Sequence, residues 1–198
     1  MANFDAQNIA NTVWAFATVG HSDSQLFATL ARTAEWRIAD FDAQNIANTV
    51  WAFATRDQLD KKVLLALARA TERRVGEFNA QGLANTTWAF ATGGRPDVKL
   101  FAVLVGAVER WVGQSNPQGL ANTAWAFATA GRSDENLFVV MARAVERRVD
   151  EFNDQGLTNT AWAFSKARQS DTPVIAMLAS AAAGHIREFI PQTHANAA

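Results

Sequence analysis

Two sets of amide side chains recur along the chain at an interval of 37 residues, and their chemistry suits recognition by hydrogen bonds. The first set, the glutamine column, comprises Gln7, Gln44, Gln81, Gln118 and Gln155. The second set, the asparagine column, comprises Asn11, Asn48, Asn85, Asn122 and Asn159. A carboxamide presents both donors and acceptors, as the edge of a nucleobase does. Because the two columns are four residues apart, they would lie side by side on a helix.

A third set of positions at the same interval differs between copies. It consists of Asn8, Asn45, Gly82, Gly119 and Gly156. Residues that read a varied nucleic-acid sequence should themselves vary between repeats. Since Asn in two copies and Gly in three would discriminate little, we expect either a simple preferred tract or a weak sequence preference.

Arginines in the polar connections could bind phosphates. Arg56, Arg95, Arg132 and Arg168 occur at roughly one per repeat, with His21 near the same place in the first copy. Such spacing could track a nucleic-acid backbone. The alternative is that they are ordinary surface arginines.

Structural roles compete with recognition for each column. Asn is a mediocre helix former, so its column could instead form a hydrogen-bonded ladder between neighbouring units. The glutamine column lies in a first helical turn, where local capping would also explain it.

Tryptophan recurs as Trp14, Trp51, Trp88, Trp125 and Trp162. These rings could stack on bases, but their place at the edge of an apolar stripe favours packing between helices.

Each unit is predicted to contain two helices that position these columns. The first helix follows a capping residue, namely Asp5, Asp42, Asn79, Asn116 or Asn153. In the first copy Ile9, Val13 and Phe16 form its apolar stripe. The second helix starts at a column of aspartates that begins with Asp23, and its stripe includes Leu30. No stretch alternates with a period of two, so we expect no strands.

A two-helix unit cannot bury its apolar faces alone, whereas stacked units can. The fold prediction is therefore all-α, a right-handed α-solenoid of two-helix repeats with a 37-residue period. Residues 1–198 would form a single array, with repeats at 4–40, 41–77, 78–114, 115–151 and 152–188 and a partial sixth at 189–198.

Composition removes several classes of function. The chain has no cysteine, which excludes disulfides, thiolate zinc sites and a cysteine nucleophile. The three histidines lack metal-ligand spacing, and the adjacent His21, Ser22 and Asp23 cannot adopt the geometry of a catalytic triad. We therefore expect no catalytic residue, cofactor or metal.

The net charge of −1 excludes a broadly cationic nucleic-acid binder, although not a local basic stripe. No spanning segment or presequence is visible.

The repeated block resembles a known repeat family. From Phe4 to Ala17 it reads Phe-Asp-Ala-Gln-Asn-Ile-Ala-Asn-Thr-Val-Trp-Ala-Phe-Ala, and it returns from Phe78 to Ala91 with four changes. This block is similar to octotricopeptide and heptatricopeptide repeats, and to the repeats of FAST-kinase-like mitochondrial RNA proteins and a kinetoplastid RNA-editing mediator. The likeness extends from Phe4 to Gln192. It implies an α-solenoid that binds single-stranded organelle RNA and influences its processing, stability or translation. No stretch of these 198 residues resembles the C-terminal RAP domain that is common in that family.

The functional hypothesis combines the amide columns with this resemblance. We expect an RNA-binding helical-repeat protein in mitochondrial or plastid RNA processing, with single-stranded RNA as partner and other RNA-processing proteins beside it. Neither membrane nor DNA is expected as a partner. The alternative is a protein-binding scaffold of the armadillo or HEAT type, for which a neutral surface lined by Asn would serve equally well.

Overall fold

The computed structural model describes residues 4–21, 23–57, 61–93, 98–169 and 173–195. Within these ranges the chain contains ten α-helices and four short 3₁₀ helices and has no strand. The prediction of an all-α fold is confirmed. None of the helices in the described ranges is long and apolar enough to cross a membrane.

The helices alternate between two kinds along the chain. The odd-numbered ones are α1 (Ala6–Thr18), α3 (Ala43–Thr55), α5 (Ala80–Thr92), α7 (Pro117–Thr129) and α9 (Asp154–Lys166). The even-numbered ones are α2 (Ser24–Arg37), α4 (Lys61–Arg74), α6 (Val98–Trp111), α8 (Glu135–Glu146) and the longer α10 (Pro173–Ala195). A 3₁₀ turn follows each of the first four even helices: η1 (Ile38–Asp40), η2 (Val75–Glu77), η3 (Val112–Gln114) and η4 (Val149–Glu151).

Side-chain caps determine where every odd helix begins. The carboxylate of Asp5 accepts a hydrogen bond from the backbone N–H of Asn8 at 2.8 Å. Equivalent bonds of 2.7–2.8 Å are made by Asp42, Asn79, Asn116 and Asn153. A cap of this kind stabilises a helix by about 1 kcal/mol. Because the caps lie 37 residues apart, the glutamine and asparagine columns take the same angular position on each odd helix.

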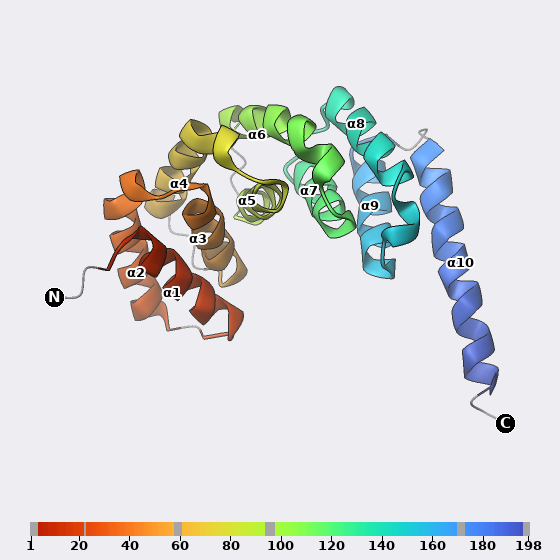
Figure 1. Ribbon diagram of the computed structural model, residues 1–198, viewed down its shortest axis with the longest axis horizontal. Coiled ribbons are helices and arrows are strands. Elements are labelled where there is room, and N and C mark those ends of the chain that lie inside the picture. Colours follow the sequence, from red (N-terminus) through yellow and green to blue (C-terminus); the bar gives the residue numbers. More distant parts are fainter. Residues whose placement is uncertain (1–3, 22, 58–60, 94–97, 170–172, 196–198) are drawn as a thin grey trace.

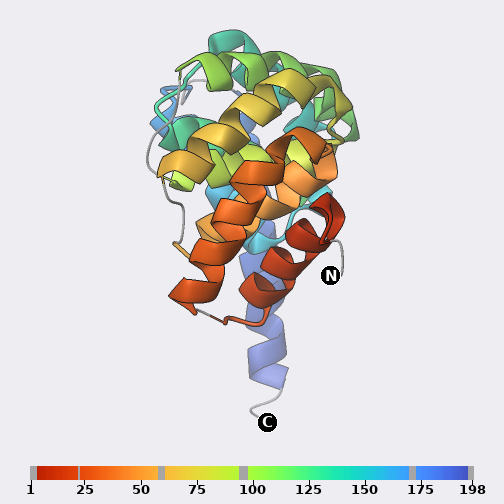
Figure 2. The same ribbon diagram turned by 90° about the vertical axis from the view of Figure 1, so that its left-hand side faces the viewer.

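The helices form an arch, with α3, α5, α7 and α9 on the inner side and α4, α6 and α8 on the outer side (Figure 1). Each odd helix packs on the next odd helix, from α1 on α3 to α7 on α9. The even helices also contact the next even helix, and α10 packs mainly against α9. In the end-on view α10 extends well below the rest of the array (Figure 2). The odd helices therefore supply a continuous inner surface.

Phenylalanines from successive repeats meet in the core. The rings of Phe138 in α8 and Phe164 in α9 lie edge to face, with centroids 5.2 Å apart and planes at 85°. Phe101 and Phe127 make the same kind of contact between α6 and α7. Edge-to-face contacts contribute about 0.5–1.5 kcal/mol beyond the area that they bury. These contacts fix each repeat against its neighbour.

On its N-terminal flank, the first repeat has no neighbouring repeat packed against it among the described residues. Phe41, Phe78 and Phe152 are buried against the preceding helices, whereas the equivalent Phe4 is 46% exposed. Among the described residues no helix lies on that side of α1. The surface that later repeats use for stacking is thus open at this end.

Candidate functional site

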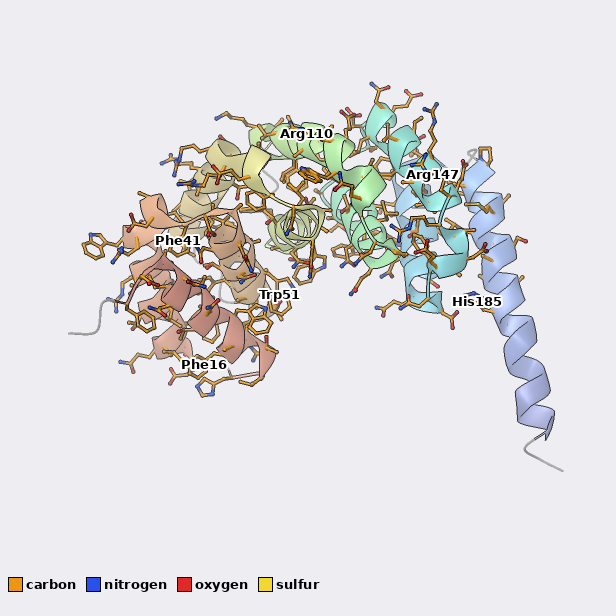
Figure 3. All side chains as sticks on the ribbon, in the orientation of Figure 1. Phe16, Phe41, Trp51, Arg110, Arg147 and His185 are labelled. Atoms are coloured by element: carbon orange, nitrogen blue, oxygen red, sulfur yellow. The ribbon has the colours of Figure 1, made fainter. Side chains whose placement is uncertain are left out.

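On each odd helix, one stripe of side chains points away from the even helices, toward the inner side of the arch. It joins the glutamine, asparagine and tryptophan columns, which are spaced i, i+4 and i+7 and so share one helix face. All five glutamines are exposed. Asn11 is exposed, and the other four asparagines of its column are half-buried. Figure 3 shows Trp51 on the inner side of the arch, where this stripe runs.

The tryptophan column both packs and remains accessible. Trp51, Trp88 and Trp125 are half-buried against the core, as the packing interpretation predicts. Trp14 and Trp162, however, are 45% and 42% exposed. The ammonium group of Lys166 lies 5.4 Å from the ring centroid of Trp162, within range of a cation–π interaction. Exposed aromatic faces beside a cation are the elements of a stacking platform for bases.

Cavities lie between consecutive odd helices, at the end where the amides are. The α3/α5 cavity has a volume of about 350 Å³, and its walls include Gln44, Asn48, Gln81 and Asn85. The α5/α7 cavity has a volume of about 280 Å³, and its walls include Gln81, Asn85, Gln118 and Asn122. The two cavities occupy equivalent positions one repeat apart. The structure therefore brings the amides of neighbouring repeats together around shared hollows.

Each cavity has a further polar wall residue that the sequence reasoning missed. Glu77, the last residue of η2, lines the α3/α5 cavity, and Gln114, the last residue of η3, lines the α5/α7 cavity. Asp40 and Glu151 are their counterparts in η1 and η4. The sequence does contain a signal for this column, because its residues recur every 37 positions and are acidic in three copies and Gln in the third. The column was overlooked because these residues lie between the two predicted helices of a repeat, on the face of neither.

Arginines hold three of these four acidic or amide residues. Arg37 bonds to Asp40 at 2.7 Å and Arg74 to Glu77 at 3.0 Å, each pair three residues apart. Hydrogen bonds from Arg148 lower the pKa of the Glu151 carboxyl below its ordinary value and raise the pKa of Arg148. In the third copy Trp111 occupies the position of these arginines and precedes the neutral Gln114.

Arg148 also joins the two ends of its own repeat. Its Nη1 atom donates to the backbone carbonyl of Ser115, which lies 33 residues earlier and just before α7. Its other bonds reach Glu151 at the end of η4. The arginine therefore couples the position of η4 to the start of α7.

The third column does not lie on the open stripe. Asn45 is only 8% exposed, whereas Asn8 is exposed on the flank of α1 that no helix of the described residues covers. A Cβ placed on Gly82 would lie 3.2 Å from the capping oxygen of Asn79 and 3.7 Å from Ala47 on α3. This column therefore faces the cap and the preceding odd helix. The expectation that it supplies the variable reading surface is not supported for Asn45, which stacking removes from solvent.

The threonines that follow the asparagine column on α3, α5 and α9 are likewise buried. Thr49, Thr86 and Thr160 are all fully buried. Thr160 donates its hydroxyl to the carbonyl of Gly156 at 2.7 Å. Packing of a helix on each flank of α3, α5 and α9 accounts for this burial.

The predicted phosphate contacts lie at the other end of the odd helices. Arg56 and Arg132 are half-buried in the connections, and Arg168 is exposed. Arg95 lies outside the described residues. At 1.5 Å per residue, Arg56 is about 18 Å from Gln44 along α3. The amides and the arginines thus form the two edges of the inner surface and do not converge on one point.

Titratable groups are sparse around this surface. His185 on α10 lies 2.6 Å from the carboxylate of Asp154 on α9, and Figure 3 shows it on the side of α10 toward α9. In the described part of the chain, no group of three or more His, Asp or Glu is arranged to hold a metal ion.

Comparisons with known proteins give the family. The family described as RNA-editing substrate-binding complex 6 protein matches residues 1–116, which is more than half of the chain and spans α1 to α6. A second family, of unknown function (DUF1601), matches residues 136–160 in α8 and α9. No curated protein matches the chain. The chain belongs to the family of RNA-editing substrate-binding complex 6 proteins.

Proposed function

We propose that this protein binds single-stranded RNA along the inner surface of the arch and acts in mitochondrial RNA editing. The observation that carries the proposal is the exposed stripe of Gln, Asn and Trp on the odd helices, with amide-lined cavities between them. The family name supports it, because it describes a complex that binds the substrates of RNA editing.

The architecture that suits this role is a right-handed α-solenoid of octotricopeptide or heptatricopeptide type. The starts of α1, α3, α5, α7 and α9 at a constant 37-residue spacing support it, as does the repeated contact of each odd helix with the next. Repeat proteins of this kind present about one base to each repeat. The RNA strand would therefore cross the odd helices one after another.

Bases and backbone then contact different edges of the surface. The bases enter the amide-lined cavities or stack on the exposed indoles, as with Trp162 and its neighbouring Lys166. The backbone runs on the side of the connections, where Arg56, Arg132 and Arg168 lie. Because the whole chain carries a net charge of −1, base contacts supply a larger share of the affinity than in strongly basic RNA-binding proteins.

The protein acts by binding rather than by catalysis, and it works with other proteins of the editing machinery. The family name supports contacts with other proteins, because it describes a complex. The small net charge of −1 favours the second candidate function, a scaffold of the armadillo or HEAT type that binds only protein.

Direct binding measurements distinguish the two functions. Fluorescence anisotropy with a single-stranded RNA of mixed sequence should show binding at low salt that weakens as salt rises. Gln81→Ala with Asn85→Ala should weaken binding, since these residues line both cavities. Arg143→Gln on the outer helix α8 serves as the control. If the unaltered chain binds no RNA at low salt, the scaffold function stands and the RNA-binding function is overturned.

A further inference from the structure

The two cavities of the inner surface differ in charge although their amide walls are equivalent. Glu77 and the capping residue Asp42 both line the α3/α5 cavity. In the α5/α7 cavity Gln114 stands at the position of Glu77. The counterpart of Asp42 one repeat later is the neutral Asn79, which is not among the residues that line this cavity. No charged residue is among the residues that line this second cavity. One cavity is therefore acidic and the other neutral.

The carboxylate of Glu77 is oriented and still able to accept further hydrogen bonds. Arg74 Nη1 donates to its two oxygens at 3.1 and 3.0 Å. The Glu77 side chain nevertheless keeps 52% of its surface exposed. An ionised carboxylate has about four acceptor positions and no donor. Since Arg74 uses two of these positions, about two remain open to a ligand.

Acceptor-only groups distinguish between nucleobases. Cytosine and adenine carry an exocyclic amino donor on the edge that single-stranded RNA presents to proteins. Uracil carries carbonyl oxygens there, with one ring N–H between them, so a carboxylate meets acceptors on both sides. A glutamine amide can donate as well as accept and does not impose this restriction.

From this difference we infer that the α3/α5 cavity selects an amino-bearing base against uracil, whereas the α5/α7 cavity accepts either. The inference rests on the proposed binding of single-stranded RNA. It assigns the selection to the last residue of each 3₁₀ turn, Glu77 or Gln114, and not to the amide columns. The amides, which are the same in both cavities, supply hydrogen bonds that any base can use.

The chain itself supplies matched substitutions for the test. Glu77→Gln introduces into the α3/α5 cavity the residue that the α5/α7 cavity has, and Gln114→Glu makes the reverse change. Glu109→Gln on the outer helix α6 alters the net charge equally, away from both cavities, and is the control. Circular dichroism verifies that each variant keeps its helical content.

The experiment measures fluorescence anisotropy with labelled oligo(C) and oligo(U) of equal length at one salt concentration. We expect Glu77→Gln to lower the preference for oligo(C) over oligo(U) by about two- to tenfold, the size of one net hydrogen bond. Gln114→Glu should raise that preference, and Glu109→Gln should leave it unchanged.

Two results would overturn the inference, and they are distinguishable. If RNA binds but the preference is the same in the unaltered chain, Glu77→Gln and Gln114→Glu, selection by the 3₁₀ residues is wrong and the proposed function stands. If the unaltered chain binds neither oligonucleotide, the proposed function and the inference fall together.

Discussion

The indole rings of Trp125 and Trp162 lie nearly parallel, with their centroids 6.2 Å apart and their planes at 28°. Trp125 belongs to α7 and Trp162 to α9, so the contact crosses from one repeat to the next. Trp125 packs on the core, whereas Trp162 keeps 42% of its surface exposed beside Lys166. Trp125 therefore supports Trp162 from the core side, and the indole of Trp162 presents an exposed aromatic face.

Removal of this aromatic face should weaken RNA binding. A base stacked on an aromatic side chain contributes about 1–3 kcal/mol, so Trp162→Ala should lower the affinity for single-stranded RNA by roughly 5- to 150-fold. Fluorescence anisotropy with oligo(C) is the measurement. Trp36→Ala is the control, because Trp36 is 81% exposed on α2 and lies outside the stripe. Equal effects of the two substitutions would contradict a specific role for Trp162.

The backbone conformation of Arg168 should cost stability, whereas its side chain is proposed to bind a phosphate. Arg168 has a φ of +60°, in a region that glycine occupies without penalty, and Gly131 occupies it at +67° in the preceding repeat. Arg168→Gly should therefore raise the free energy of unfolding by about 1 kcal/mol and should weaken RNA binding.

The reverse substitution tests the same relationship. Gly131→Arg should lower the free energy of unfolding by about 1 kcal/mol, because a φ of +67° is unfavourable for a residue with a Cβ, and the added cation should strengthen RNA binding. A Cβ at Gly131 meets no atom within 4 Å, so no steric clash contributes to the loss. Urea unfolding and anisotropy give the two quantities. A gain of stability without loss of affinity in Arg168→Gly would show that Arg168 makes no phosphate contact.

The hydrogen bonds between Arg148 and Glu151 should be visible in a titration. They hold the pKa of Glu151 below its ordinary value of 4.5. A carboxyl whose pKa is lowered by folding stabilises the fold above its unfolded pKa. That stability is lost as the pH falls through the lower, folded value.

Carbon-13 NMR of the Glu151 carboxyl measures this directly. We expect its midpoint to lie below 4.5 in the unaltered chain and to move back toward that value in Arg148→Met. An unchanged midpoint in Arg148→Met would assign the shift to another cause.

The ring contacts between repeats should dominate stability. Phe138 is fully buried and meets Phe164 edge to face. Phe138→Ala should lower the free energy of unfolding by about 3–5 kcal/mol, measured by urea denaturation. Val139→Ala on the exposed side of α8 should change it by less than about 0.5 kcal/mol. Comparable losses of stability from Phe138→Ala and Val139→Ala would show that the contact between Phe138 and Phe164 does not dominate the packing of α8 on α9.

Much of the fold could be predicted because local chemistry determines it. The capping residues Asp5, Asp42, Asn79, Asn116 and Asn153 were identified from the sequence, and all five accept the expected backbone hydrogen bond. The exposure of the glutamine column likewise follows from helical periodicity within one repeat.

The flanks of the odd helices could not be predicted in this way. Periodicity identifies the most apolar face of a helix, but the inner helices of an array bury two further flanks against their neighbours. Small and weakly polar residues suffice there, so Asn45 and Thr49 are buried although they look like surface residues. Glu77 was missed for a related reason, because the packing of α3 on α5 places a residue of a short turn at a cavity.

The packing of one odd helix on the next also sets a spacing along the inner surface. Packed helices lie about 8–10 Å apart, whereas stacked bases in a nucleic-acid strand rise by about 3.4 Å. If adjacent bases of a bound strand occupy the α3/α5 and α5/α7 cavities, as one base per repeat implies, that part of the strand is stretched and its bases are unstacked. The proposed binding would then compete directly with hairpins and with annealing to a second strand, because a strand in this form cannot pair.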